Sequence, residues 1–159
     1  MTPSDPDGSD AGAPPAAADA ALRDATSTAE RIAADEREAD ALRERLRTMG
    51  PTILEPDGAL GHHLLPGEVV HALRRSAILR GPGSDDGQGF GGMLVLTSIR
   101  VAHFGQVTMS IQLGNIVESA VAGERLLLSL GDGEGVVIDC ARPRTFRAEL
   151  ADAIRRGRP

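Results

Sequence analysis

Apolar and polar residues alternate most regularly in the middle of the chain, and the pattern predicts three consecutive strands at 93–96, 101–104 and 107–113. Gly105 and Gln106 offer a two-residue hairpin loop between the second and the third. The third strand is expected to be half-buried, because its apolar and polar residues fall on opposite faces. The apolar face carries Val107, Met109, Ile111 and Leu113, and the polar face carries Thr108, Ser110 and Gln112.

Four more strand patterns lie on either side of this meander, at 69–80, 116–121, 125–130 and 136–139. In the first of them Arg74 and Arg75 are adjacent and interrupt the alternation, which predicts a β-bulge. The glycine-rich stretch 81–91 is expected to be a flexible loop. A helix is predicted at 143–155, beginning at a proline and with one apolar face that consists of Phe146, Leu150, Ala153 and Ile154. One helix after seven strands can cap the end of a barrel.

The N-terminal third has a different composition. Residues 1–20 are poor in bulky apolar side chains and are expected to be a disordered tail. Residues 21–50 are rich in Ala, Arg, Glu, Asp and Leu and predict one long amphipathic helix. We therefore divide the chain into the tail, the helix, a linker at 51–67, a domain at 68–156 and a short tail at 157–159.

Apolar residues recur along the long helix in steps of mostly three or four, which makes a narrow seam. Two interpretations remain open: the helix lies along its own domain, or the seam joins two chains in a weak coiled coil. The first is favoured, because alanine dominates the early part of the seam and Glu36 interrupts it. The candidate interface residues are Leu22, Ile32, Leu42 and Leu46.

The order of elements and several short motifs resemble the bacterial pleckstrin-homology-like (PH-like) and GRAM-like domains. The motifs are Leu64-Leu65-Pro66-Gly67-Glu68, then 92–97 with Arg100, and then Ser110-Ile111-Gln112-Leu113 leading to Ile116. The resemblance implies a mainly β fold, a seven-stranded partly open barrel with a C-terminal capping helix. It also implies a module that docks proteins or lipids.

Composition and charge remove several classes of function. Of the 159 residues, 41% are hydrophobic but only 2% are aromatic, so platforms for stacking bases are scarce. The net charge of −6 also disfavours a nucleic-acid partner. The start of the chain lacks the pattern of a secretory signal, and a single cysteine suits a reducing compartment. We expect a cytoplasmic location, with any membrane contact peripheral and at the inner face.

No group of residues predicts catalysis, a metal site or a cofactor. Gly87, Gly89 and Gly92 match a dinucleotide-binding fingerprint, but the match leads into a strand and is better interpreted as a loop. The four histidines are expected to be packed or surface residues. Cys140 is either a reactive thiol or a small buried hydrophobe, and the second is favoured.

The strand-rich region has one cationic group that could bind an anion such as a lipid headgroup: Arg74, Arg75, Arg80 and Arg100. Three acids, Asp85, Asp86 and Glu68, could pair with these arginines instead. We therefore expect only weak binding of anionic lipid.

The sequence favours a non-enzymatic docking or adaptor module with a protein partner, and with weak homodimerisation through the long helix as an option. The alternative is a barrel that holds a small molecule or lipid in its mouth. Residues 51–159 are expected to contain a complete core and to fold without the helix.

Overall fold

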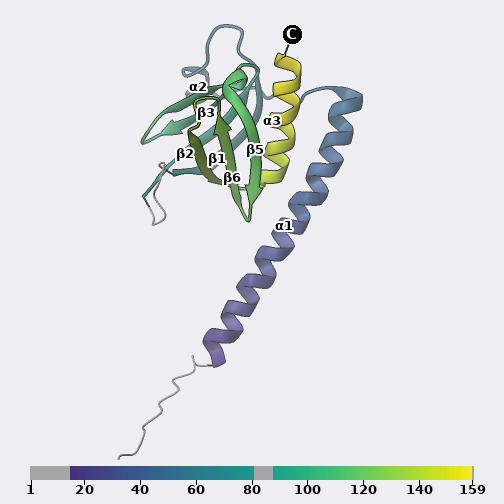
Figure 1. The fold of residues 1–159 in the computed structure, drawn as a ribbon, viewed down its shortest axis with the longest axis vertical. Helices are drawn as coiled ribbons and strands as arrows, with labels where there is room; N and C mark the ends of the chain where they lie inside the picture. The colour runs from purple at the N-terminus through teal and green to yellow at the C-terminus, as the bar shows by residue number, and fades with distance from the viewer. Residues whose placement is uncertain (1–14, 81–87, 159) are drawn as a thin grey trace, which may run out of the picture.

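The structure, a computed structural model, describes residues 15–80 and 88–158, and their seven strands form one antiparallel sheet (Figure 1). The sheet order is β4-β3-β2-β1-β7-β6-β5, so that two meanders are joined by the pairing of β1 with β7. The strands are β1 (Val70–Arg80), β2 (Gly89–Thr97), β3 (Arg100–Gly105), β4 (Met109–Gln112), β5 (Ile116–Ala122), β6 (Arg125–Leu130) and β7 (Gly135–Cys140). The helices are α1 (Pro15–Met49), α2 (Gly58–Gly61), the 3-10 helix η1 (Leu113–Asn115) and α3 (Pro143–Gly157).

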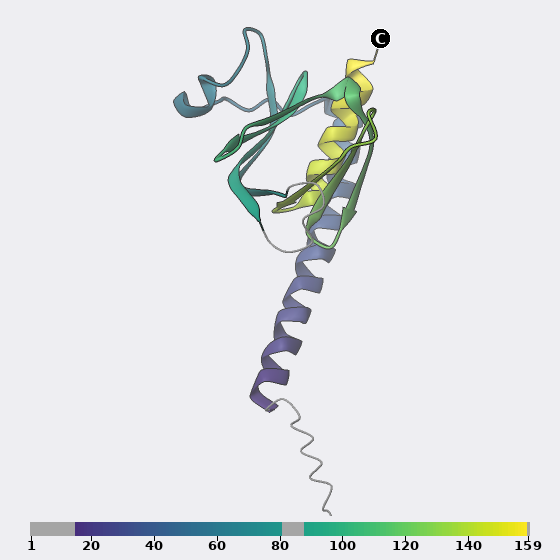
Figure 2. The same cartoon turned by 60° about the vertical axis from the view of Figure 1, so that its left-hand side comes forward.

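The sheet is curled and stays open between its edge strands, β4 and β5. Figure 2 shows its two halves inclined toward each other, with α3 beside the open side and α1 beyond α3. The predicted fold class is confirmed: a seven-stranded, partly open barrel with a C-terminal capping helix, preceded by a long N-terminal helix.

The main core lies between the concave face of the sheet and α3. Phe146, Leu150 and Ala153 of α3 are buried against residues of both sheet halves, as the predicted apolar face of this helix requires. In β4 the predicted faces are also confirmed, because Ile111 is buried and Ser110 is exposed. The extent of this strand was wrong, since it spans only Met109–Gln112, Val107 precedes it and Leu113 belongs to η1.

The predicted bulge in β1 is present. The register between β1 and β2 shifts between Arg74 and Ala77. These two residues are buried, while Arg75 and Ser76 between them are exposed. The bulge therefore turns the side chain of Arg74 into the molecule, although it is adjacent to a surface arginine.

The predicted loop at 81–91 ends earlier than expected, because β2 already begins at Gly89. A Cβ atom on Gly89 would lie 2.1 Å from a side-chain methyl of Ile78, and one on Gly92 would lie 2.5 Å from the carbonyl oxygen of Phe104. Glycine here permits close approach of neighbouring strands and does not mark a flexible segment. Gly87 and the rest of the 81–87 stretch lie outside the described residues.

The linker at 51–67 is not a simple tether. Asp57 accepts a hydrogen bond of 2.8 Å from the backbone N–H of Leu60 and so caps the short helix α2. Leu60 is buried in a second apolar cluster with Val95 and Phe104, on the sheet face that points away from α3. The linker therefore covers the outer side of β1, β2 and β3.

Candidate docking site

Helix α1 divides into a docked half and a projecting half. Its docked half packs against α3 through a small apolar cluster of Ala39, Leu42, Leu46 and Ala148. The two helices run in the same direction, because Asp35 contacts the first turn of α3 and Leu46 contacts its last turn. The packing of this half favours the interpretation in which the helix lies along its own domain.

Asp35 anchors the docked half by capping α3. The residue that precedes α3, Arg142, has a left-handed backbone (φ 51°) and its side chain makes no capping hydrogen bond. The carboxylate of Asp35 instead accepts hydrogen bonds from the backbone N–H groups of Arg144 (2.8 Å) and Thr145 (3.0 Å) and from the Thr145 hydroxyl (2.7 Å). With 4% exposure, Asp35 serves α3 as an N-cap supplied by another helix.

Further polar contacts fix α1 along the same stretch. Arg142 donates to Glu38 at 2.6 Å, and Arg156 donates to the carbonyl oxygen of Leu46 at 3.3 Å. Nearer the N-terminus, Arg31 pairs with Glu124 in the turn between β5 and β6 at 2.9 Å. Beyond this pair α1 leaves the domain.

The N-terminal half of α1 projects past the sheet (Figure 1). Every residue from 15 to 30 is exposed except Thr28, which is half-buried. Of the predicted interface residues, the structure buries Leu42 and Leu46 against α3, half-buries Ile32 and leaves Leu22 67% exposed.

The docked and projecting halves share one line of side chains. Ala25, Ile32, Ala39 and Leu46 recur every seven residues and so lie along one side of the helix. In the docked half this line is buried, Ile32 is half-buried where α1 leaves the domain, and Ala25 farther out is exposed and is flanked by Leu22 and Ala29. We call Leu22, Ala25, Ala29 and Ile32 the arm seam.

A groove of about 780 Å³ lies beside the base of the projecting half. Its walls come from β1, β2, β7 and the turn between β5 and β6, and they include Arg75, Ile78 and Arg125. Glu124 lines the groove and also pairs with Arg31 of α1, on a different side of the helix from the arm seam. The groove and the arm seam are therefore separate surfaces at the base of the projecting half.

The structure does not bring the four candidate arginines into one site. Arg75 pairs with Asp57 at 3.3 Å, and Arg80 pairs with Asp139 at 2.7 Å. Arg74 is buried between β1 and α3, where its guanidinium lies 5.5 Å from the centre of the Phe146 ring. Each arginine thus has partners of its own.

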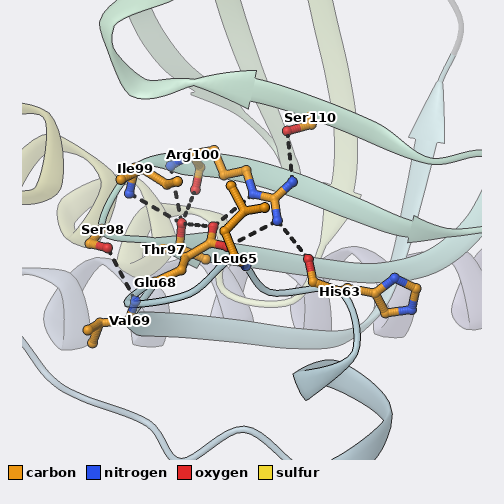
Figure 3. Close-up of polar contacts among 9 residues, drawn as sticks. All are labelled: His63, Leu65, Glu68, Val69, Thr97, Ser98, Ile99, Arg100 and Ser110. Carbon is orange, nitrogen blue, oxygen red and sulfur yellow. Dashed lines mark hydrogen bonds and ion pairs between the residues drawn. The ribbon is translucent and has the colours of Figure 1, made fainter.

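Arg100, the fourth, is part of a buried network that ties the linker to the hairpin of β2 and β3 (Figure 3). Its guanidinium donates to both oxygens of Glu68, at 2.8 and 3.0 Å, and to the carbonyl oxygen of His63 at 2.8 Å. Glu68 also accepts from the hydroxyl of Thr97 at 2.6 Å and from the backbone N–H of Leu65 at 2.8 Å. The motif residues Glu68, Thr97 and Arg100 therefore support the fold.

The electrostatics of this network agree with that role. Burial acts to raise the pKa of Glu68, but the hydrogen bonds from Arg100 and then from Thr97 outweigh it and lower the pKa. The Glu68 carboxylate stays ionised and both of its oxygens accept hydrogen bonds, so the guanidinium of Arg100 is paired inside the protein.

The remaining candidates are packing residues. Cys140 is buried, and burial raises the pKa of its thiol to about 11, as the favoured interpretation expected. His103 is buried and contacts the carbonyl oxygen of Val107 at 3.0 Å, while His63 stacks on Phe104 with ring centres 4.4 Å apart. In the described ranges 15–80 and 88–158, no three His, Cys, Asp or Glu side chains are placed to hold a metal ion. None of the helices within those ranges has the length and apolar character needed to cross a membrane.

Sequence reasoning missed Asp35, the acid that holds α1 on the domain. A signal was present, because Asp35, Ala39, Leu42 and Leu46 are spaced by four, three and four residues. An acid in phase with buried apolar residues marks a carboxylate that needs an internal partner.

Comparisons with known proteins add the following. No protein-family model matches the sequence, and no curated protein matches it. Among solved structures, the chain is similar to the N-terminal PH domain of Vps36, with 20% identity, a TM-score of 0.48, and coverage of 58% of this chain and 83% of that one. It is also similar to the C-terminal domain of an unknown protein from Leishmania infantum, with 13% identity, a TM-score of 0.47, and coverage of 56% and 87%.

Proposed function

We propose that this protein is a non-enzymatic docking module that binds a helix of a partner protein along the arm seam. The observation that carries the proposal is the division of α1. One half is held on the domain by Asp35 and its neighbours, and the other half continues the same line of side chains with Ile32 half-buried and Ala25 exposed. A helix held at one end offers a pre-organised surface, which lowers the entropy cost of binding a second helix.

The charge of the projecting half indicates which charge its partner carries. Residues 15–30 carry Asp19, Asp24 and Glu30 against Arg23 alone, a net charge of 1 − 3 = −2. A partner helix with an apolar stripe and basic flanks would complement this surface. A second copy of the chain would bring the same negative charge.

Self-association is therefore expected to be weak. The alanines of the arm seam bury little area, at roughly 25 cal/mol for each Å² of apolar surface removed from water. Like charge on the two arms would oppose the contact further. The preferred occupant is a different protein, and a homodimer through α1 is the minor option.

The alternative of a ligand inside the barrel has less support. The interior that such a ligand would occupy is filled by a continuous cluster of sheet and α3 side chains. Its most completely buried members are Leu94, Leu96, Val101, Leu126, Leu128, Ile138, Phe146 and Leu150.

The test compares three versions of the tagged full chain in an affinity capture from the source cell. The first is unaltered, the second carries Leu22→Asp with Ala29→Asp on the arm seam, and the third carries Ala16→Asp with Ala20→Asp on the opposite side of α1. Both double variants add two acids at exposed positions of the projecting half, so total charge is matched and helix propensity is similar.

The proposal predicts one partner that is captured by the unaltered chain and by the opposite-side variant, and that is lost from the arm-seam variant. Equal capture by all three chains would show that the partner binds a surface other than the arm seam. Equal loss from both variants would show that the effect comes from added charge and would also contradict the proposal.

A further inference from the structure

A second site lies between α1, β1 and the start of α3. A cavity of about 370 Å³ opens there, near the lower end of the range of about 300–1,000 Å³ typical of small-ligand sites. Its polar lining comes from three separate parts of the chain and is unusually rich in arginine. The polar residues are Glu38, Arg45, Arg74, Arg142, Thr145 and Glu149.

Arg74 brings a buried positive charge to this cavity, and its carboxylate neighbour is not hydrogen-bonded to it. Only 8% of the residue is exposed, and its guanidinium donates to three main-chain carbonyl oxygens, those of Ala141 at 2.7 Å, Leu73 at 3.1 Å and Arg142 at 3.4 Å. Its carboxylate neighbour is Glu149, whose Oε2 lies 3.9 Å from Nη2, too far for a hydrogen bond. A guanidinium has five N–H donors, so two remain for a bound group.

Glu149 adds a buried carboxyl group to the lining of this cavity. Its Oε2 is buried and has no hydrogen-bond partner among the described residues. Burial raises the pKa of Glu149 to about 7, although Arg74 and Arg142 act to lower it. The three arginines and two carboxylates that line the cavity give a net charge of 3 − 2 = +1 when Glu149 is ionised and 3 − 1 = +2 when it is protonated.

The surroundings of Glu149 on every side are charged or titratable. It also lines a second cavity, of about 270 Å³, on the side of the α1 C-terminus. The groups that face it across the two cavities are His71 and Arg74 from β1, Glu38 and Arg45 from α1, Arg142 before α3, and Asp152 and Arg156 from α3.

We infer that the cavity binds a small soluble oxyanion, a sulfate, phosphate or carboxylate group, between Arg74, Arg142 and Glu149. The guanidinium groups of Arg74 and Arg142 supply charge and N–H donors, and Arg142 keeps donors beyond the one that it gives to Glu38 at 2.6 Å. A protonated carboxyl of Glu149 supplies an O–H donor where an ionised one would repel the anion. Arg45 lies at the same cavity and adds positive charge from α1. Binding should therefore take up a proton.

Sulfate is the probe, because it stays dianionic between pH 6 and pH 8. Binding to the full chain is measured by calorimetry and by the amide NMR shifts of Ala41 and Thr145, at constant ionic strength with chloride as the replacement salt. Saturable binding is expected, and it should be about tenfold tighter at pH 6 than at pH 8, in proportion to the protonated fraction of Glu149.

Three variants separate a built site from general attraction. Arg45→Gln and Arg142→Gln should each weaken sulfate binding at least several-fold, while Arg37→Gln, the same charge change at an exposed position of α1 outside the cavity, should not. Glu149→Gln should keep sulfate binding at pH 8 and abolish its pH dependence. Retained unfolding midpoints identify variants that keep the fold.

Several results would overturn the inference. These are the absence of saturable sulfate binding, equal weakening by Arg37→Gln, or an unchanged pH dependence in Glu149→Gln. A separate experiment uses vesicles of acidic phospholipid. If the chain binds these vesicles but not free sulfate, and if Arg142→Gln removes the vesicle binding, the cavity binds a lipid headgroup and the soluble anion is rejected.

Discussion

The cap that Asp35 provides to α3 can be tested by Asp35→Ala. The substitution leaves two backbone N–H groups and the hydroxyl of Thr145 without their acceptor at the buried start of α3. Loss of an N-cap alone costs about 0.5–2 kcal/mol, and each buried donor left unpaired costs about 1–3 kcal/mol. Because water can enter beside α1 and recover part of this, we expect a loss of about 2–4 kcal/mol in the free energy of unfolding.

Urea denaturation of the full chain measures this loss. The matched control is Glu36→Ala, which removes a neighbouring acid that is exposed and only 3.4 Å from the guanidinium of Arg144. An exposed ion pair contributes about 0–1 kcal/mol, so the control should shift the free energy of unfolding by less than about 1 kcal/mol. Equal effects of the two substitutions would show that Asp35 does not cap α3 and that α1 is not held as described.

The same cap changes the expectation for the truncated chain 51–159. The core between the sheet and α3 remains in that fragment, but Asp35 and the apolar contact of Leu42 and Leu46 with Ala148 are lost. We now expect residues 51–159 to fold with clearly lower stability than the full chain.

Three further outcomes follow from the structure. Glu149→Gln should raise the free energy of unfolding at pH 8 by up to about 3 kcal/mol and flatten its pH dependence. The reason is that burial raises the pKa of Glu149 from 4.5 to about 7, so the folded chain loses stability as the pH rises through that range. An unfolding profile that is the same as that of the unaltered chain would contradict this. Ile111→Asp should abolish folding, at a cost of several kcal/mol, whereas Ser110→Asp on the exposed face should leave the thermal midpoint nearly unchanged, and equal midpoints would reverse the assigned faces. The full chain should sediment little with acidic vesicles at about 0.15 M salt, and strong sedimentation would contradict the internal pairing or burial of its candidate cations. Those cations are Arg74, Arg75, Arg80 and Arg100.

Most of the sheet could be predicted from the sequence because its information is local. Alternation fixes which side of a strand is buried, and adjacent Arg74 and Arg75 marked the bulge where the register shifts. The start of β2 was missed for a physical reason, since the close approach of Gly89 to Ile78 depends on strand pairing that composition does not show.

The candidate site was harder to predict because its contacts are distant in sequence. Asp35 and Thr145 are separated by 110 positions, and no local rule pairs them. For the arginines, Glu68 was one of three acids expected as possible partners, and it pairs with Arg100. The sequence did not indicate that Asp57 would pair with Arg75, because only the fold brings the two together.

The start of α1 shows a third limit. The helix begins at Pro15, six positions before the predicted start at residue 21. The alanine-rich composition of residues 15–20 supports a helix. These residues are all exposed and contain no bulky apolar side chain, so their low hydrophobic content predicted a disordered tail instead.

The most direct test of the account is hydrogen exchange along α1, measured on the full chain alone and then with the partner that the arm-seam variant loses. We predict that amides at 39–47 exchange far more slowly than those at 16–30 in the free chain, because only the docked half is held on α3. Adding the partner should slow exchange chiefly at 16–32. Uniform protection along α1 in the free chain, or slowing by the partner that spares 16–32, would contradict the division of α1 into an anchor and a docking arm.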